Sequence, residues 1–172
     1  TLMNVLYGLY RSTSGTVVIV GDERVFDSPR DAIDAGIGMI HQHFILVEPM
    51  SVTQNVVLGN EPRKWGGLAV DRQRAREEVA ELAESYGFDV DPTAAVEDIS
   101  VGEQQRVEIL KALYRGADTL ILDEPTAVLT PQEVDELFGV FEELTDAGKT
   151  IIFITLKLSE ATGAADEVTV LR

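Results

Sequence analysis

The chain contains no cysteine, which excludes a disulfide framework and any metal site built on thiolates. It is also poor in basic residues: 14 lysines and arginines stand against 30 aspartates and glutamates, for a formal net charge of −16. Proteins that bind the phosphate backbone of nucleic acids do so through clustered lysine and arginine. The charge balance therefore argues against a nucleic-acid partner.

Long apolar runs are absent as well. No stretch of the sequence approaches the roughly 20 apolar residues that a membrane-crossing helix needs, so we expect no transmembrane span. Hydrophobic residues make up 45% of the 172 residues and charged residues 26%, a composition typical of globular proteins. This length supports one domain, or one domain with a subdomain.

Apolar runs of strand length alternate with helical patterns at both ends of the chain, which predicts an α/β fold with a mainly parallel sheet. The middle third has a helical pattern and reads as an insertion. The expected strands cover residues 16–20, 37–41, 119–122, 150–155 and 167–171. The expected helices include residues 29–36, 71–86, 101–115, 131–147 and 158–164, with a loop at 61–67.

Two of these helices have a clear start signal. Ser100 with Glu103, and Thr130 with Glu133, have the spacing of a capping box, in which the two residues satisfy each other's backbone N–H groups. Pro131 occupies the first helical position, which favours the same reading. On these residues alone, helix capping is the preferred role for Ser100.

The stretch LILDEPT (120–126) leads a strand that is apolar on both faces into two carboxylates, Asp123 and Glu124. Two readings are open: solvated acids at a strand end, or a site for a metal and a phosphate. Ligands of open α/β sheets collect at the carboxyl ends of the strands. We therefore expect Gln42, after strand 37–41, and Leu156, after strand 150–155, to converge with the acidic pair.

With these stretches in place, the sequence resembles the ATP-binding subunits of ABC transporters. ISVGEQQRVEIL (99–110) resembles the family's signature sequence, LILDEPTAVLTPQE (120–133) resembles its Walker B motif and D-loop, and Gln42 falls at its Q-loop. HQHF (41–44) and VGEQQRVEILKALYRGA (101–117) look most like the first of two fused ATPase halves in simple-sugar and nucleoside importers. The HQHF form leans towards the nucleoside branch.

The resemblance implies a RecA-like P-loop NTPase core with a helical subdomain insertion. It divides the chain into an N-terminal part of the core (1–48), a helical subdomain with the signature (49–115) and a C-terminal part of the core (116–172). It also implies a subunit that binds and hydrolyses ATP with Mg²⁺ at the cytoplasmic face of the membrane. The implied partners are a second ATPase domain (a homo-oligomer or a fused half), transmembrane permease subunits and, indirectly, a solute-binding protein.

The same resemblance assigns roles around the acidic pair. Asp123 would hold Mg²⁺, often through water, and Glu124 would orient or deprotonate the attacking water. Gln42 would contact the metal or the water through its amide. The apolar run Phe44, Ile45 and Leu46 would help to receive a transmembrane subunit.

A second group of residues would contact nucleotide. Ser100, Gly102 and Gln104 lie at the start of the signature helix, which would face the γ-phosphate held by the second ATPase domain. Thr1 would follow directly after the family's phosphate loop, G-x-x-x-x-G-K-[ST]. The glycines and lysine of that loop are not in the sequence, so we expect an amino-terminally truncated piece of a longer protein.

Leu156 is the second departure from the family pattern. The family has a histidine there that contacts the γ-phosphate and helps to position the water, and leucine can do neither. The switch position is therefore degenerate. Two alternative functions stay open at this point: a soluble ABC-type ATPase without a membrane partner, and a catalytically impaired fragment that acts only as an interaction module.

Overall fold

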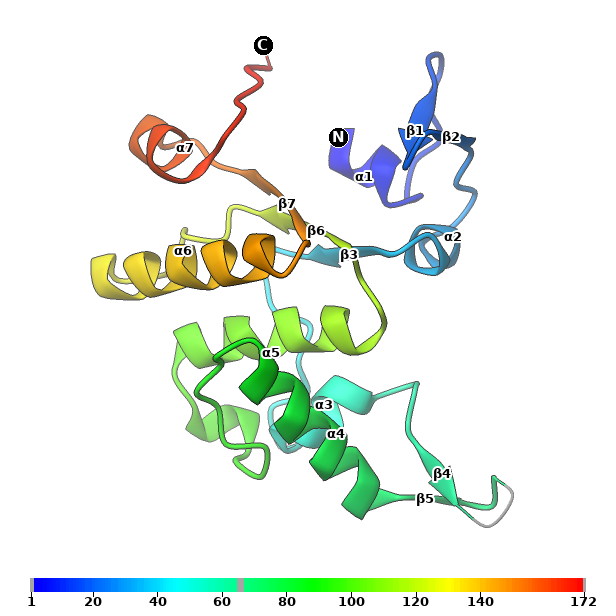
Figure 1. The fold of residues 1–172 in the computed structure, drawn as a ribbon, viewed down its shortest axis with the longest axis vertical. Coiled ribbons are helices and arrows are strands. Elements are labelled where there is room, and N and C mark those ends of the chain that lie inside the picture. The colour runs from blue at the N-terminus through cyan, green and yellow to red at the C-terminus, as the bar shows by residue number, and fades with distance from the viewer. Residues whose placement is uncertain (1, 65–66, 172) are drawn as a thin grey trace.

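The structure, a computed structural model, describes residues 2–64 and 67–171. Its centre is a parallel sheet with the order β3-β6-β7, formed by β3 (Ile37–Ile40), β6 (Thr119–Asp123) and β7 (Thr150–Ile154). The register aligns Met39, Ile121 and Ile152 across the three strands. The predicted α/β class with a parallel sheet is confirmed, and Figure 1 shows helices on both sides of this sheet.

β6 is buried on both faces, as its apolar run predicts. Leu120 and Leu122 are 0% exposed and pack into a large cluster with α5 (Val101–Tyr114) and α6 (Pro131–Asp146). Ile121 is 1% exposed and belongs to a separate cluster on the opposite face. The acidic pair therefore lies at the carboxyl end of the central strand of the sheet.

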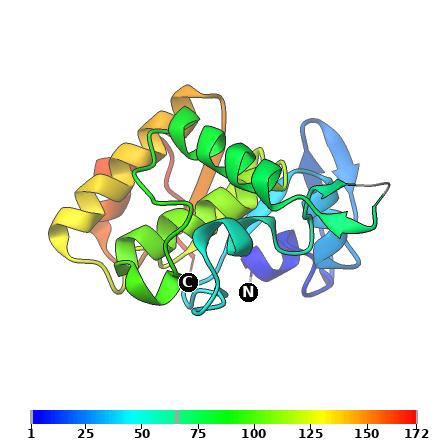
Figure 2. The same ribbon diagram turned by 90° about the horizontal axis from the view of Figure 1, so that it is seen from below.

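The opposite face is covered by the first part of the chain. Its elements are α1 (Leu2–Leu6), the antiparallel hairpin of β1 (Val17–Ile19) and β2 (Asp22–Arg24), and α2 (Pro29–Asp34). Gly8, two residues after α1, has a φ of +74°, and a Cβ there would lie 2.5 Å from the carbonyl oxygen of Ser28. Only glycine fits both conditions. Figure 2 shows this hairpin and α6 on opposite sides of the molecule.

The middle third is helical, as predicted. α3 (Val52–Val57), α4 (Arg72–Ser85), a short 3₁₀ turn (Val96–Asp98) and α5 lie together at one end of the molecule in Figure 1. Val56, Val79 and Val107, one from each α-helix, are each 0% exposed. Gly38 of β3 permits close packing of the sheet on α5, since a Cβ there would lie 2.8 Å from that of Ala112.

Two sequence predictions need correction. Residues 61–67 are not all loop, because β4 (Arg63–Lys64) pairs with β5 (Ala69–Val70) in a small hairpin whose turn includes Gly67 at φ +97°. Residues 167–171 form no strand. Val170 is 79% exposed there, and the segment pairs with no strand in the described part of the chain. Strand propensity alone does not form a strand without a neighbour to pair with.

The remaining predicted helices are present. α6 begins after Thr130 with the predicted capping box and Pro131 at its first position, and α7 spans Leu158–Ala164. Within residues 2–64 and 67–171, no helix is both long and apolar enough to cross a bilayer.

Tyr114 offers a pH-dependent test of how α5 packs on α4. Its hydroxyl donates a hydrogen bond to Glu78 Oε2 at 2.7 Å. Burial, followed by this hydrogen bond, raises the pKa of Tyr114 to about 12. Because the neutral phenol is the favoured form, its stabilisation is complete below pH 10, the ordinary value, and is lost as the pH rises through 12.

We expect Tyr114→Phe to lower the free energy of unfolding by about 1 kcal/mol at neutral pH. The difference from wild type should shrink between pH 10 and 12, measured by urea unfolding together with phenolate absorbance. Tyr10→Phe is the matched control, since Tyr10 is 57% exposed. A difference that stays constant with pH would contradict the role given to the Glu78 contact.

Candidate functional site

The carboxyl ends of the three parallel strands meet at one edge of the sheet. Gln42 lies two residues after β3, Asp123 is the last residue of β6, and Leu156 lies two residues after β7. Gln42 Nε2 lies 3.4 Å from Glu124 Oε2 and donates a hydrogen bond to it, although 82 positions separate the two residues. The structure therefore brings Gln42, the predicted Q-loop glutamine, and the second carboxylate of the pair together, as the strand-end argument predicts.

Glu124 has an unusual backbone conformation. Its φ is +48°, a left-handed value that non-glycine residues adopt rarely and at a cost of about 1–3 kcal/mol. Its N–H donates to the carbonyl of Ile154 at 3.1 Å, and its carbonyl accepts from the N–H of Ala127 at 3.1 Å. These contacts to β7 and to the following turn hold the strained residue where β6 ends, directly after Asp123.

The side chains at this edge suit a hard cation with few protein ligands. Asp123, Glu124 and Gln42 supply carboxylate and amide oxygens, the donors that Mg²⁺ prefers. Across the described residues there is no group of three or more His, Cys, Asp or Glu side chains that could enclose a metal. The donor set therefore fits Mg²⁺ held mainly by water and phosphate, and does not fit a cage made of protein alone.

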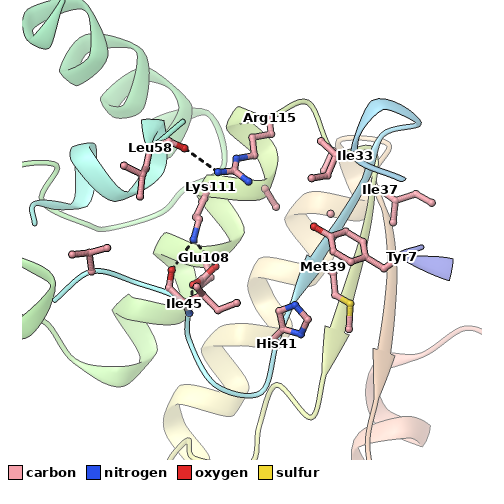
Figure 3. A pocket seen from close by; sticks show the side chains of 14 residues that line it. Tyr7, Ile33, Ile37, Met39, His41, Ile45, Leu58, Glu108, Lys111 and Arg115 are labelled. Carbon is pink, nitrogen blue, oxygen red and sulfur yellow. Dashed lines mark hydrogen bonds and ion pairs between the residues drawn. The ribbon is translucent and has the colours of Figure 1, made fainter. Parts of the chain in front are cut away.

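The segment after Gln42 is fixed to α5. The N–H of Ile45 donates to Glu108 Oε1 at 2.7 Å, and Lys111 Nζ donates to the carbonyl of Ile45 at 2.8 Å (Figure 3). Of the predicted docking run, only Ile45 is largely exposed, at 64%, whereas Leu46 packs against the core and Phe44 is half-buried. The run therefore presents one apolar side chain on a fixed backbone.

A cavity of about 360 Å³ opens beside Ile45, between β3 and α5. Its walls are largely apolar, but Tyr7, His41, Lys111 and Arg115 also line it (Figure 3). Tyr7 and His41 contact each other edge to face, with ring centroids 6.4 Å apart. Arg115 donates to the carbonyl of Leu58 at 2.9 Å, which ties the same helix to the end of α3.

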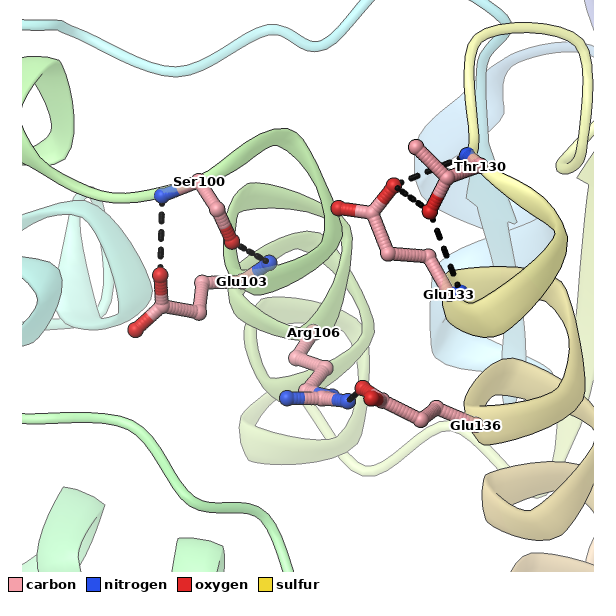
Figure 4. Close-up of polar contacts among 6 residues, drawn as sticks. All are labelled: Ser100, Glu103, Arg106, Thr130, Glu133 and Glu136. Carbon is pink, nitrogen blue, oxygen red and sulfur yellow. Dashed lines mark hydrogen bonds and ion pairs between the residues drawn. The ribbon is translucent and has the colours of Figure 1, made fainter.

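The start of α5 is built as its sequence predicts. Ser100 Oγ accepts from the N–H of Glu103 at 3.2 Å, and Glu103 Oε2 accepts from the N–H of Ser100 at 2.8 Å (Figure 4). The predicted capping box is confirmed. Gln104 Nε2 donates to the carbonyls of Val96 and Ile99 at 3.2 and 3.3 Å, so this amide nitrogen supports the loop that leads into the helix.

Gly102 is closely approached by a carboxylate of the same chain. A Cβ at Gly102 would lie 3.1 Å from Glu133 Oε1, in the first turn of α6. Hydrogen bonds from the N–H and hydroxyl of Thr130, with a contribution from the N–H of Gly102, lower the pKa of Glu133. Arg106 forms an ion pair with Glu136 one turn further along (Figure 4). The start of α5 is thus attached to α6, the helix that follows the acidic pair.

The loop after β7 makes contacts that sequence reasoning missed. Leu156 is 87% exposed and brings no polar group to the edge. Its neighbours Thr155 and Lys157 instead contact Glu160, a buried carboxylate on α7 that also accepts from Thr126. The only sequence signal for these contacts was Thr126, which directly follows Asp123, Glu124 and Pro125. Thr1, the remaining predicted nucleotide contact, lies outside the described residues.

Comparison with known protein families gives a match over residues 1–127 to the model for the ABC transporter family. The nucleoside import ATP-binding protein NupA of Lactococcus lactis is 53% identical over 172 residues, covering 100% of this chain and 34% of that protein. The guanosine import ATP-binding protein NupO of Bacillus subtilis is 52% identical over 172 residues, which cover 100% of this chain and 33% of that protein. The glucose import ATP-binding protein TsgD13 of Haloferax volcanii is 50% identical over 198 positions, which cover 100% of this chain and 36% of that protein.

The chain therefore spans about a third of the length of the curated relatives that it matches. Solved structures agree on the fold. The ADP conformation of MJ1267, an ATP-binding cassette of an ABC transporter, has a TM-score of 0.80 at 22% identity over 96% of this chain and 68% of its own. CbiO1 of Clostridium perfringens, part of the transporter complex cbiONQ, has a TM-score of 0.77 at 24% identity, over 96% of this chain and 65% of its own.

These cassettes share the α/β P-loop NTPase fold seen here, with its parallel sheet and covering helices. The family model spans the sheet edge where Gln42 meets Glu124 and also α5. Since it matches the first 127 of the 172 residues, this chain belongs to the ABC transporter family.

Proposed function

We propose that this chain is part of the ATP-binding and ATP-hydrolysing subunit of an importer for nucleosides or simple sugars. The observation that carries the proposal is the contact between Gln42 and Glu124 at the strand edge, directly beside Asp123. The names of the relatives NupA, NupO and TsgD13 support the solute class, with two nucleoside importers among them.

The chemistry proposed for this edge is hydrolysis of ATP by an activated water. Glu124 accepts the proton of the attacking water, and Gln42 helps to hold that water through its amide. Asp123 is the carboxylate that would hold Mg²⁺. The ion, when bound with ATP, would neutralise charge on the β- and γ-phosphates. Thr1 would contact the nucleotide from the position directly after the phosphate-binding loop.

The signature helix tip, formed by Ser100, Gly102 and Gln104, is proposed to serve a second ATPase domain. Backbone N–H groups and the positive end of the helix dipole at this tip favour an anion such as a γ-phosphate. The capping box and the Gln104 contacts fix the shape of the tip before any partner arrives. Two domains would thus complete each other's nucleotide sites.

Coupling to transport is proposed to pass through Ile45. This side chain is exposed beside the cavity, and Phe44 and Leu46 flank it, so a transmembrane permease subunit is the partner we assign to this segment. The protein would then lie at the cytoplasmic face of the membrane, and a solute-binding protein would act through the permease. The hydrogen bonds that join Ile45 to Glu108 and Lys111 would transmit movement between residues 44–46 and α5.

We also propose the division into core (1–48 and 116–172) and helical subdomain (49–115). Its support is the grouping of α3, α4 and α5 away from the β1–β2 hairpin and α7. Movement of the helical part against the core is the two-state element that closing and reopening a dimer requires.

The test is uptake by proteoliposomes that contain the full-length protein and its permease subunits. We expect ATP-dependent uptake of labelled nucleoside or simple sugar, with unlabelled nucleoside the better competitor, and none with Glu124→Gln. ATP hydrolysis without uptake of either solute class would instead favour a soluble ABC-type ATPase. Nucleotide binding without turnover would favour an impaired module, the alternative that Leu156 supports.

A further inference from the structure

Glu160 is a buried carboxylate with no role in the proposed chemistry. It lies on α7 and is only 7% exposed. A charge buried in this way is costly unless hydrogen bonds and an opposite charge satisfy it. The groups that contact the Glu160 carboxylate therefore indicate its structural role.

Both oxygens of Glu160 are satisfied, and the donors come from two different loops. Thr126 Oγ1 lies 2.8 Å from Oε1 and from Oε2, and Thr155 Oγ1 donates to Oε2 at 2.6 Å. Lys157 Nζ pairs with Oε1 at 2.9 Å. Burial raises the pKa of Glu160, but the hydrogen bonds from Thr155, Lys157 and Thr126 outweigh it, and the pKa lies below its ordinary value. The carboxylate is therefore charged at neutral pH.

The two loops are the ones that follow β6 and β7 at the candidate site. Thr126 is 3% exposed and lies two residues after Glu124, and Thr155 directly precedes Leu156. Lys157 N–H donates to Thr155 Oγ1 at 3.0 Å, and Lys157 Nζ reaches Thr126 Oγ1 at 3.5 Å. The four side chains thus form one closed network across the sheet edge.

This network bears on the strained backbone of Glu124. That residue is held on one side by the hydrogen bond from its N–H to Ile154 and on the other by the turn to Ala127. Thr126 lies within this turn, so its bonds to Glu160 fix the turn to α7. A left-handed glutamate persists only where its surroundings determine the conformation.

We propose that Glu160 is a positioning residue: its buried carboxylate locks the loops 124–127 and 155–157 into one unit and thereby holds Glu124 in its left-handed conformation, facing Gln42. The catalytic consequence of this lock rests on the function proposed above. Glu160 does not touch the reacting atoms and acts through Thr126 and Thr155.

The first measurement is amide hydrogen exchange of the full-length protein, read by mass spectrometry of peptides. Glu160→Gln keeps the shape but removes the charge, and we expect exchange in 124–127 and 155–157 to rise about tenfold. Thr126→Val should do the same, whereas Thr126→Ser, which retains the hydroxyl donor, should exchange as wild type. Glu167→Gln, which removes an exposed carboxylate seven residues further along the chain, is the matched control.

The second measurement separates positioning from general damage. Glu160→Gln and Thr126→Val should each lower kcat for ATP hydrolysis about 10- to 100-fold with unchanged ATP affinity, and the double variant should be no worse than either single variant. Wild-type exchange and kcat in both variants would overturn the proposal, as would equal damage by Thr126→Ser. If the wild-type protein hydrolyses no ATP, the proposed function fails, and the exchange measurement still decides whether the lock exists.

Discussion

Glu124→Gln in the full-length protein should lower ATP hydrolysis by about 100-fold or more while ATP binding stays close to wild type. Glutamine keeps the size of the side chain and can still contact Gln42, which lies 3.4 Å from Glu124 Oε2. It cannot accept a proton, and removing a positioned general base typically costs 10²–10⁴-fold in rate. Steady-state phosphate release and nucleotide affinity, measured on the same preparation, test this.

Two matched variants sharpen this experiment. Glu142→Gln removes an exposed carboxylate on α6 and should leave both quantities unchanged. Asp123→Asn should give a different pattern, a greater Mg²⁺ requirement, because the first carboxylate is assigned to the metal. Hydrolysis by Glu124→Gln at the wild-type kcat would remove Glu124 from the proposed chemistry.

Leu122→Ala should lower the free energy of unfolding by about 3.5 kcal/mol, the middle of the range for buried leucines. Leu122 is 0% exposed and packs in the cluster shared by β6, α5 and α6. Strands pair with β6 on both sides, so the backbone has little freedom to collapse into the cavity that the substitution leaves. Urea unfolding should show a lower midpoint with an unchanged m-value.

Val128→Ala is the control for this prediction, because Val128 lies six residues further along the chain and is 59% exposed. Its effect should stay within about 0.5 kcal/mol. A loss below about 1 kcal/mol for Leu122→Ala would mean that the core around β6 relaxes more readily than its packing indicates.

Local features were predicted well because they depend on residues close in sequence. The capping boxes at Ser100 and Thr130 need only a partner three positions away, and both are present. The burial of β6 follows from its uninterrupted apolar run. The prediction of a strand at 167–171 was wrong because a strand depends on a distant partner as well as on its own sequence. Its apolar alternation is a local feature, but among the described residues no strand lies beside it to pair with.

Sequence by itself determined the class of the fold, the helix starts and the order of the motifs, because periodicity, capping and spacing are properties of neighbouring residues. Only the tertiary structure decided which side chains meet. The contact of Gln42 with Glu124, the clamp of Glu108 and Lys111 on Ile45, and the burial of Glu160 against Thr126 all join distant segments. Such contacts depend on how the sheet and helices pack, and a carboxylate such as Glu160 looks like any other helical glutamate until that packing surrounds it.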